Sequence, residues 1–187
     1  MHNSKQVINL QKSIEYKEDC IEPQVKMITE LINKMIEYET GCPQRINHFL
    51  KVWAFAKQIA ENENIDSKTK FIIESVAVIH DIGIKPSLEK YNSSAGHYQQ
   101  IEGPAVARKI LSESRFEIEL IDRICFLIAN HHTYDNIDGI DYQILIEADF
   151  LVNIFEDGLS KEKIILIKGK YFKTTSSKDL LDKLYLK

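Results

Sequence analysis

The sequence is poor in cysteine, and the few cysteines it has argue against two classes of small protein. Cys20, Cys42 and Cys125 are odd in number, lie far apart and form no CxxC pair. Disulfide frameworks and cysteine zinc knuckles both depend on sets of cysteines at characteristic spacings. We therefore expect three reduced thiols, which is typical of a cytosolic protein.

The sequence also lacks long apolar runs and an excess of positive charge. No run approaches the roughly 20 residues that a membrane helix needs, and residues 1–20 hold no apolar core of signal-peptide length. The net charge of −4 argues against a broad nucleic-acid-binding face. We expect a cytoplasmic protein without membrane association and without an extended nucleic-acid surface.

Helical periodicity dominates the sequence, whereas strand alternation is scarce. Repeats, low-complexity segments and domain boundaries are not evident. The pattern predicts an all-α bundle of roughly six to nine helices. We expect a polar N-terminal arm over 1–22 and a single helical domain over 23–187, with 157–187 as a C-terminal helical extension.

The apolar stripes place the expected helices. They are predicted over 23–39, 45–63, 66–81, 104–114, 117–132 and 141–157, with two short ones in the last 30 residues. The segment 66–81 is apolar nearly all round and is expected to be the central buried helix. Residues 84–100 are rich in turn formers and are predicted to form a loop. The next helix is expected to begin at Gly103-Pro104, since proline is tolerated in a first turn.

Six polar side chains interrupt the apolar faces of four of these helices. They are His48, His80, Asp81, His131, His132 and Asp149. Each alone has an ordinary explanation, as a hydrogen-bonded core histidine, a cap or an ion-pair partner. Together they predict a divalent cation, because a cation accepts neutral imidazole and carboxylate and offsets the cost of burying them. Mn, Fe, Co, Ni and Zn all suit such donors.

The order of these residues resembles the HD superfamily of metal-dependent phosphohydrolases. The strings that carry the resemblance are NHFLKVWAFA, AVIHDIGIK, IEGPAVARKIL, IANHH and EADFLVN, and it spans residues 23–156. The resemblance implies an all-α HD-domain-like bundle in which His48, His80, Asp81 and Asp149 hold one metal. Members chiefly hydrolyse nucleotides, cyclic dinucleotides and polyphosphorylated nucleosides. A minority are di-iron oxygenases, and some are inactive.

The function expected from this resemblance is hydrolysis of a small phosphoester, in the first place a nucleotide, by metal-activated water. Asp81 would also orient the water, and Lys85 and Arg45 would contact phosphate. Glu102 is a candidate base or water-mediated metal ligand, with helix capping as its alternative. A non-catalytic metal- or nucleotide-binding module and a di-iron oxygenase are the alternative functions, and a homodimer is left open.

Two positions depart from the family pattern. Relatives often have a lysine three residues after the HD aspartate, where this sequence has Ile84 and the lysine follows as Lys85. Two-metal relatives often have a histidine four residues before the matching glycine, where this sequence has Gln99. His97 and Glu102 are the nearest candidates to replace it.

The missing histidine bears on the number of metal ions. We expect one tightly held metal, because four ligands are present without His131 and His132. These two histidines would then contact substrate phosphate or bind a weaker second ion.

Overall fold

The computed structural model describes residues 23–187, and every regular element in that range is helical. The prediction of an all-α fold is thus confirmed, and the predicted arm over 1–22 lies outside the described residues. The elements are a helix over 23–38, α2 (Pro43–Asn62), α3 (Ser67–Ile79), α4 (Ile84–Tyr91), α5 (Gly96–Glu113), α6 (Ile118–Asn130), α7 (Ile140–Glu156), α8 (Lys161–Tyr171), α9 (Thr175–Leu181) and a final π-helical turn, η1 (Asp182–Leu186).

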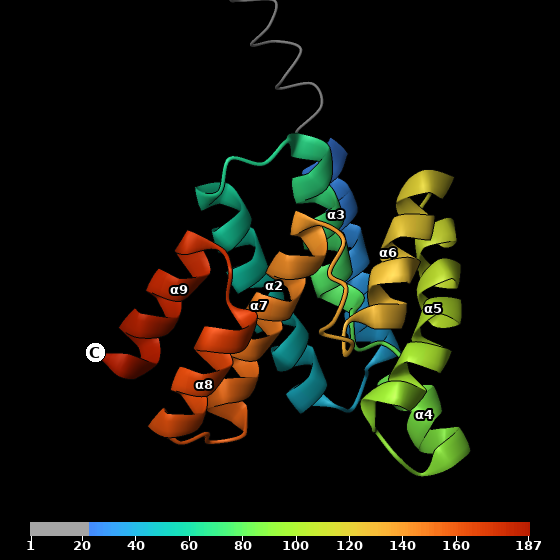
Figure 1. Cartoon of the computed structure of the whole chain (residues 1–187). Coiled ribbons are helices and arrows are strands. Elements are labelled where there is room, and N and C mark those ends of the chain that lie inside the picture. The colour runs from blue at the N-terminus through green and yellow to red at the C-terminus, as the bar shows by residue number, and fades with distance from the viewer. Residues whose placement is uncertain (1–22) are drawn as a thin grey trace, which may run out of the picture.

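The bundle is organised around three helices that pack against one another, α2, α3 and α7. On one side α6 packs on α3, α5 pairs with α6, and α4 packs on α5. On the other side α8 and α9 lie against α7 (Figure 1). None of these helices combines the length and apolar character required to cross a bilayer.

The central position of α3 follows from its sequence. Asp66 caps the helix by accepting a hydrogen bond from the Thr69 backbone N–H at 3.0 Å. Most of its later residues are fully buried, and the hydroxyl of Ser75 is satisfied by donating to the carbonyl of Phe71 at 2.7 Å. The helix ends at Ile79, inside the protein, so the residues that follow it begin in the interior.

The prediction of a loop over 84–100 is wrong, because most of this segment is helical. Ile84–Tyr91 form α4, which ends at Asn92 in the left-handed conformation with φ of 50°. The hydroxyl of Ser87 donates to the carbonyl of Gly83 at 2.7 Å, so this serine is buried and bonded within the helix. A residue typical of turns thereby serves a helix whose main support is packing against α5.

The prediction that the next helix begins at Gly103-Pro104 is also wrong, since α5 begins at Gly96 and encloses Pro104. Close packing explains the glycine. A Cβ at Gly103 would lie 2.7 Å from Cγ2 of Ile128, and a Cβ at Gly83 would lie 2.5 Å from the carbonyl oxygen of Gln99. These glycines allow backbones to approach closely and do not mark a helix boundary.

The C-terminal segment is joined to α7 through the fully buried carboxylate of Glu147. That carboxylate accepts hydrogen bonds from the backbone N–H and the hydroxyl of Thr174, at 2.9 and 2.6 Å, and from the side chain of Gln143 at 2.8 Å. Thr174 is the N-cap of α9. The buried carboxylate of Glu147 therefore satisfies the polar groups of the turn between α8 and α9.

The connection between α6 and α7 is held by Arg123. Its guanidinium donates to both carboxylate oxygens of Asp141 at 2.7 Å and to both of Asp138 at 2.8 Å. Asp141 is buried, so its negative charge has to be compensated, and the guanidinium of Arg123 does this. The bridge spans the segment that begins with His131 and His132.

Replacing Arg123 with methionine is therefore expected to lower the free energy of unfolding by about 2 kcal/mol. The value lies below the 3–5 kcal/mol typical of breaking a fully buried pair because the arginine is partly exposed. Urea denaturation measures the change. Arg108→Met is the matched control, since it breaks an exposed pair with Asp122 and should leave stability essentially unchanged. Equal stability of both variants would contradict the prediction.

Candidate metal centre

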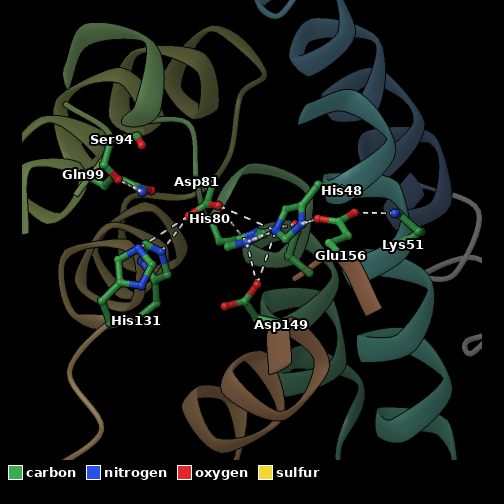
Figure 2. Close-up of polar contacts among 11 residues, drawn as sticks. His48, Lys51, His80, Asp81, Ser94, Gln99, His131, Asp149 and Glu156 are labelled. Carbon is green, nitrogen blue, oxygen red and sulfur yellow. Dashed lines mark hydrogen bonds and ion pairs between the residues drawn. The ribbon is translucent and has the colours of Figure 1, made fainter. Parts of the chain in front are cut away.

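The six polar residues singled out in the sequence meet at one place in the structure (Figure 2). His48 comes from the second turn of α2 and Asp149 from the middle of α7. The remaining four follow the ends of α3 and α6; they are His80, Asp81, His131 and His132. The termini of two helices thus face the sides of two others.

One group of donors surrounds the Nε2 atoms of His48 and His80, which are 3.3 Å apart. Oδ1 of Asp149 lies 3.3 Å from Nε2 of His48 and 3.6 Å from Nε2 of His80. Oδ2 of Asp81 lies 3.6 Å from each of the same two nitrogens. Two imidazoles and two carboxylates therefore converge on a single point.

The other ring nitrogen of each buried histidine is fixed by an acceptor. Nδ1 of His48 lies 2.9 Å from Oε2 of Glu156, Nδ1 of His80 lies 3.0 Å from the carbonyl of Ala77, and Nδ1 of His131 lies 2.8 Å from the carbonyl of Ile128. Each acceptor calls for an Nδ1–H donor, which leaves a lone pair on Nε2 in the neutral ring. This is the tautomer that binds metals through Nε2.

Lone pairs that point at one another across 3.3 Å repel unless a positive charge lies between them. In addition, Oδ1 of Asp149 is buried and has no hydrogen bond. A divalent cation satisfies the two imidazoles and both carboxylates together, so the donor set of this group fits a metal ion.

The electrostatics of the protein alone also favour positive charge here. Burial would lower the pKa of His48, but the adjacent negative charge of Asp149, with that of Asp81, raises it to about 9. Burial would raise the pKa of Asp81 and of Asp149, yet the surrounding histidines, His80 among them, hold both well below the usual range. Both carboxylates are therefore ionised and available as ligands.

A second group shares Asp81. Its Oδ1 lies 2.9 Å from Nε2 of His131 and 3.7 Å from Nε2 of His132, and these three residues are also arranged as metal ligands. Nε2 of His132 is buried without a hydrogen bond, and burial together with the charge of His131 lowers its pKa to about 4. His132 is thus neutral near pH 7. The two oxygens of Asp81 face the two groups.

Both groups border a cavity of about 480 Å³. Its other lining residues include Arg45, Ser94, Gln99, Asn153 and Asp157. Gln99 is buried; its amide donates to the carbonyl of Ser94 at 2.8 Å, while its Oε1 has no hydrogen bond. At the position where two-metal relatives often carry a histidine, this chain thus presents a fixed amide oxygen.

Arg45 lines the cavity, whereas Lys85, the other predicted phosphate contact, does not. The guanidinium of Arg45 is held by the buried carboxylate of Glu39 at 2.6 Å. Nζ of Lys85 donates to the carbonyl of Tyr38 at 3.0 Å and lies over the ring of that tyrosine. It is bound to the end of the 23–38 helix because α4, which replaces the predicted loop, directs its side chain there.

Glu102 and His97 also lie outside the cavity. Glu102 is in the middle of α5, where its carboxylate accepts from Nζ of Lys90 and, at 2.8 Å, from the hydroxyl of Tyr91. It thereby joins α5 to the end of α4 and caps no helix at 103–104. His97 is exposed, with its ring 3.9 Å from that of Tyr98.

Sequence reasoning missed one residue in direct contact with the centre, Glu156. It lies seven residues after Asp149, and a spacing of seven returns to the same face of a helix after two turns. That spacing is the signal by which it could have been found. Asn153 and Asp157 follow Asp149 by four and eight residues and so carry a similar signal, whereas Ser94 carries none.

Comparison with known proteins agrees with this geometry. The model of the HD domain family matches residues 45–169, a range that contains all six converging residues. The chain belongs to the HD domain family. A predicted HD superfamily hydrolase from an uncultured Thermotogales bacterium has a similar crystal structure, with a TM-score of 0.61, 21% identity and 83% of each chain covered. At that identity the similarity shows that the two share the HD fold. A search of the curated proteins finds no match.

Proposed function

We propose that this HD domain protein is a metal-dependent hydrolase of small phosphoesters. The proposal rests on one observation, that Asp81 presents its two oxygens to two groups of side chains with the donors and spacing of metal ligands, at the wall of a cavity. A divalent metal bound by His48, His80, Asp81 and Asp149 would lower the pKa of a bound water and polarise a phosphoryl oxygen. Mn, Fe, Co, Ni and Zn are all compatible with these ligands.

The residues of the chain have distinct parts in this proposal. Asp81 binds the metal and orients the attacking water, since its second oxygen faces away from the first group. Arg45 binds a phosphate oxygen; Glu39 engages its Nε and one terminal nitrogen and leaves the other for the substrate. His131 and His132 contact the phosphoryl group or hold a weaker second ion beside it.

A nucleotide is the substrate we propose first, in keeping with the known activities of the family. A cavity of about 480 Å³ falls within the roughly 300–1,000 Å³ typical of small-ligand sites. The alternative is a module that binds metal or a nucleotide without turnover. Structural metal sites close their coordination sphere with protein ligands, whereas the donors in this chain border a cavity, which favours catalysis.

The test is a screen of the metal-loaded protein against nucleotides, cyclic dinucleotides and simple phosphomonoesters, with release of phosphate as the measurement. Turnover that requires the metal is the expected result. A protein that retains metal and hydrolyses none of the panel would favour the binding module. A visible iron chromophore with oxygen-dependent turnover would favour the di-iron oxygenase.

His132 distinguishes the two metal positions, because it contacts Asp81 and lies outside the first group. His132→Ala is expected to keep near one equivalent of metal after extensive dialysis and to lose on the order of 100-fold in turnover. Elemental analysis and phosphate release are the measurements. His97→Ala, which removes an exposed histidine outside the cavity, is the control. Two equivalents of metal in the dialysed wild type would contradict this prediction.

A further inference from the structure

His48 differs from the other two buried histidines of the centre in what holds its Nδ1. His80 and His131 each use a backbone carbonyl three residues earlier in the chain. His48 uses the carboxylate of Glu156, which comes from the other end of the sequence. One ligand is thus supported by a charged side chain, and the others by neutral groups of their own segment.

The carboxylate of Glu156 is itself held from both sides. Its Oε2 lies 2.9 Å from Nδ1 of His48, and its Oε1 pairs with Nζ of Lys51, one turn after His48 on α2 (Figure 2). Glu156 is at the last position of α7, the helix that carries Asp149. The contact therefore joins the two helices whose sides supply ligands to the first group.

A carboxylate acceptor has two effects on a metal-binding imidazole. It fixes the tautomer with the proton on Nδ1, and it raises the basicity of Nε2 more than a neutral carbonyl does. It also restrains the ring, which for His48 projects from the side of a helix and has no carbonyl partner for Nδ1. We propose that Glu156, oriented by Lys51, is a positioning residue that sets the metal affinity of the first group.

This inference rests on the proposed metal centre, but it concerns binding and not turnover. If Glu156 and Lys51 were only an ion pair at the protein surface, their loss would change little, since exposed pairs contribute little to stability. Contact with His48 predicts a different result, a change in metal affinity in a protein that remains folded.

The experiment measures the affinity for zinc of the wild type, Glu156→Gln and Glu156→Ala by competition with a chromophoric chelator, without substrate. Loss of a partner of this kind typically weakens metal binding about 10- to 100-fold, and Glu156→Ala is expected to fall in that range. Glu156→Gln should be intermediate, because its amide oxygen still accepts from Nδ1–H. Circular dichroism verifies that the variants are folded.

Glu61→Ala is the matched control. It also removes a carboxylate paired with a lysine, Lys70 at 2.8 Å, and it lies on α2 about 20 Å along the axis from His48. Its zinc affinity should equal that of the wild type.

Zinc affinity of Glu156→Ala within about threefold of the control would overturn the inference. That result would leave the proposed hydrolase intact, since the wild type would still bind metal and turn over its substrate. Conversely, absence of turnover in the wild type would count against the proposed function and leave the role of Glu156 in metal binding in place.

Discussion

Asp81→Ala is expected to lower phosphoester turnover about 1,000-fold or more while the protein stays helical and folded. Within residues 23–187, Asp81 alone belongs to both donor groups, so its loss removes a proposed metal ligand and the oxygen proposed to orient the water. Metal polarisation supplies several kcal/mol of transition-state stabilisation, and about 4 kcal/mol corresponds to about 1,000-fold in rate.

The fold should survive because the core is built by apolar helices and not by the metal. The helices α3, α6 and α7 bury a continuous set of aliphatic side chains independently of the centre. Phosphate release and far-ultraviolet circular dichroism measure activity and helicity on the same sample. Asp122→Ala, an exposed carboxylate paired with Arg108, is the control and should retain full turnover. Turnover by the Asp81 variant at the wild-type rate would rule out the mechanism.

The sequence allowed the centre to be located because its residues interrupt helical stripes. His48 and Asp149 occupy positions that periodicity assigns to the core, and a polar group there needs a partner. His80 and His131 directly follow apolar helices. Because the ends of these helices are buried, the two histidines lie in the interior as well. Buried faces constrain side-chain direction strongly, and for these residues the direction was predictable.

The surroundings of the centre were not predictable in the same way. Lys85 is assigned by its distance in sequence from the HD pair and Glu102 by its distance from Gln99. In the structure α4 directs Lys85 toward Tyr38, and the long α5 directs Glu102 toward Lys90 and Tyr91. Turn-forming residues indicated a loop because their local preference is for turns, whereas here packing against α5 overrides it. Such tertiary effects leave no periodic signal in the chain.

Asp149→Ala is expected to lose the metal almost completely. Oδ1 of Asp149 is buried, has no hydrogen bond and lies 3.3 Å from Nε2 of His48 and 3.6 Å from Nε2 of His80. Removing it takes one negative charge and one ligand from the first group and leaves two imidazoles with Asp81. Loss of one partner from a buried charged set costs about 3–5 kcal/mol, which is on the order of 1,000-fold in affinity.

Elemental analysis of the dialysed protein measures this loss, with less than about one tenth of an equivalent expected at such a reduction in affinity. Asp149→Asn is the second variant: it keeps the size of the side chain but not its charge, so it should also fail to retain metal, which separates the loss of the ligand from any cavity left by alanine. Asp179→Ala, which removes an exposed carboxylate of α9 paired with Lys183, should bind metal as the wild type does. A full equivalent of metal in the folded Asp149→Ala protein would exclude Asp149 as a required ligand, because His48, His80 and Asp81, or Asp81, His131 and His132, would then hold the ion without it.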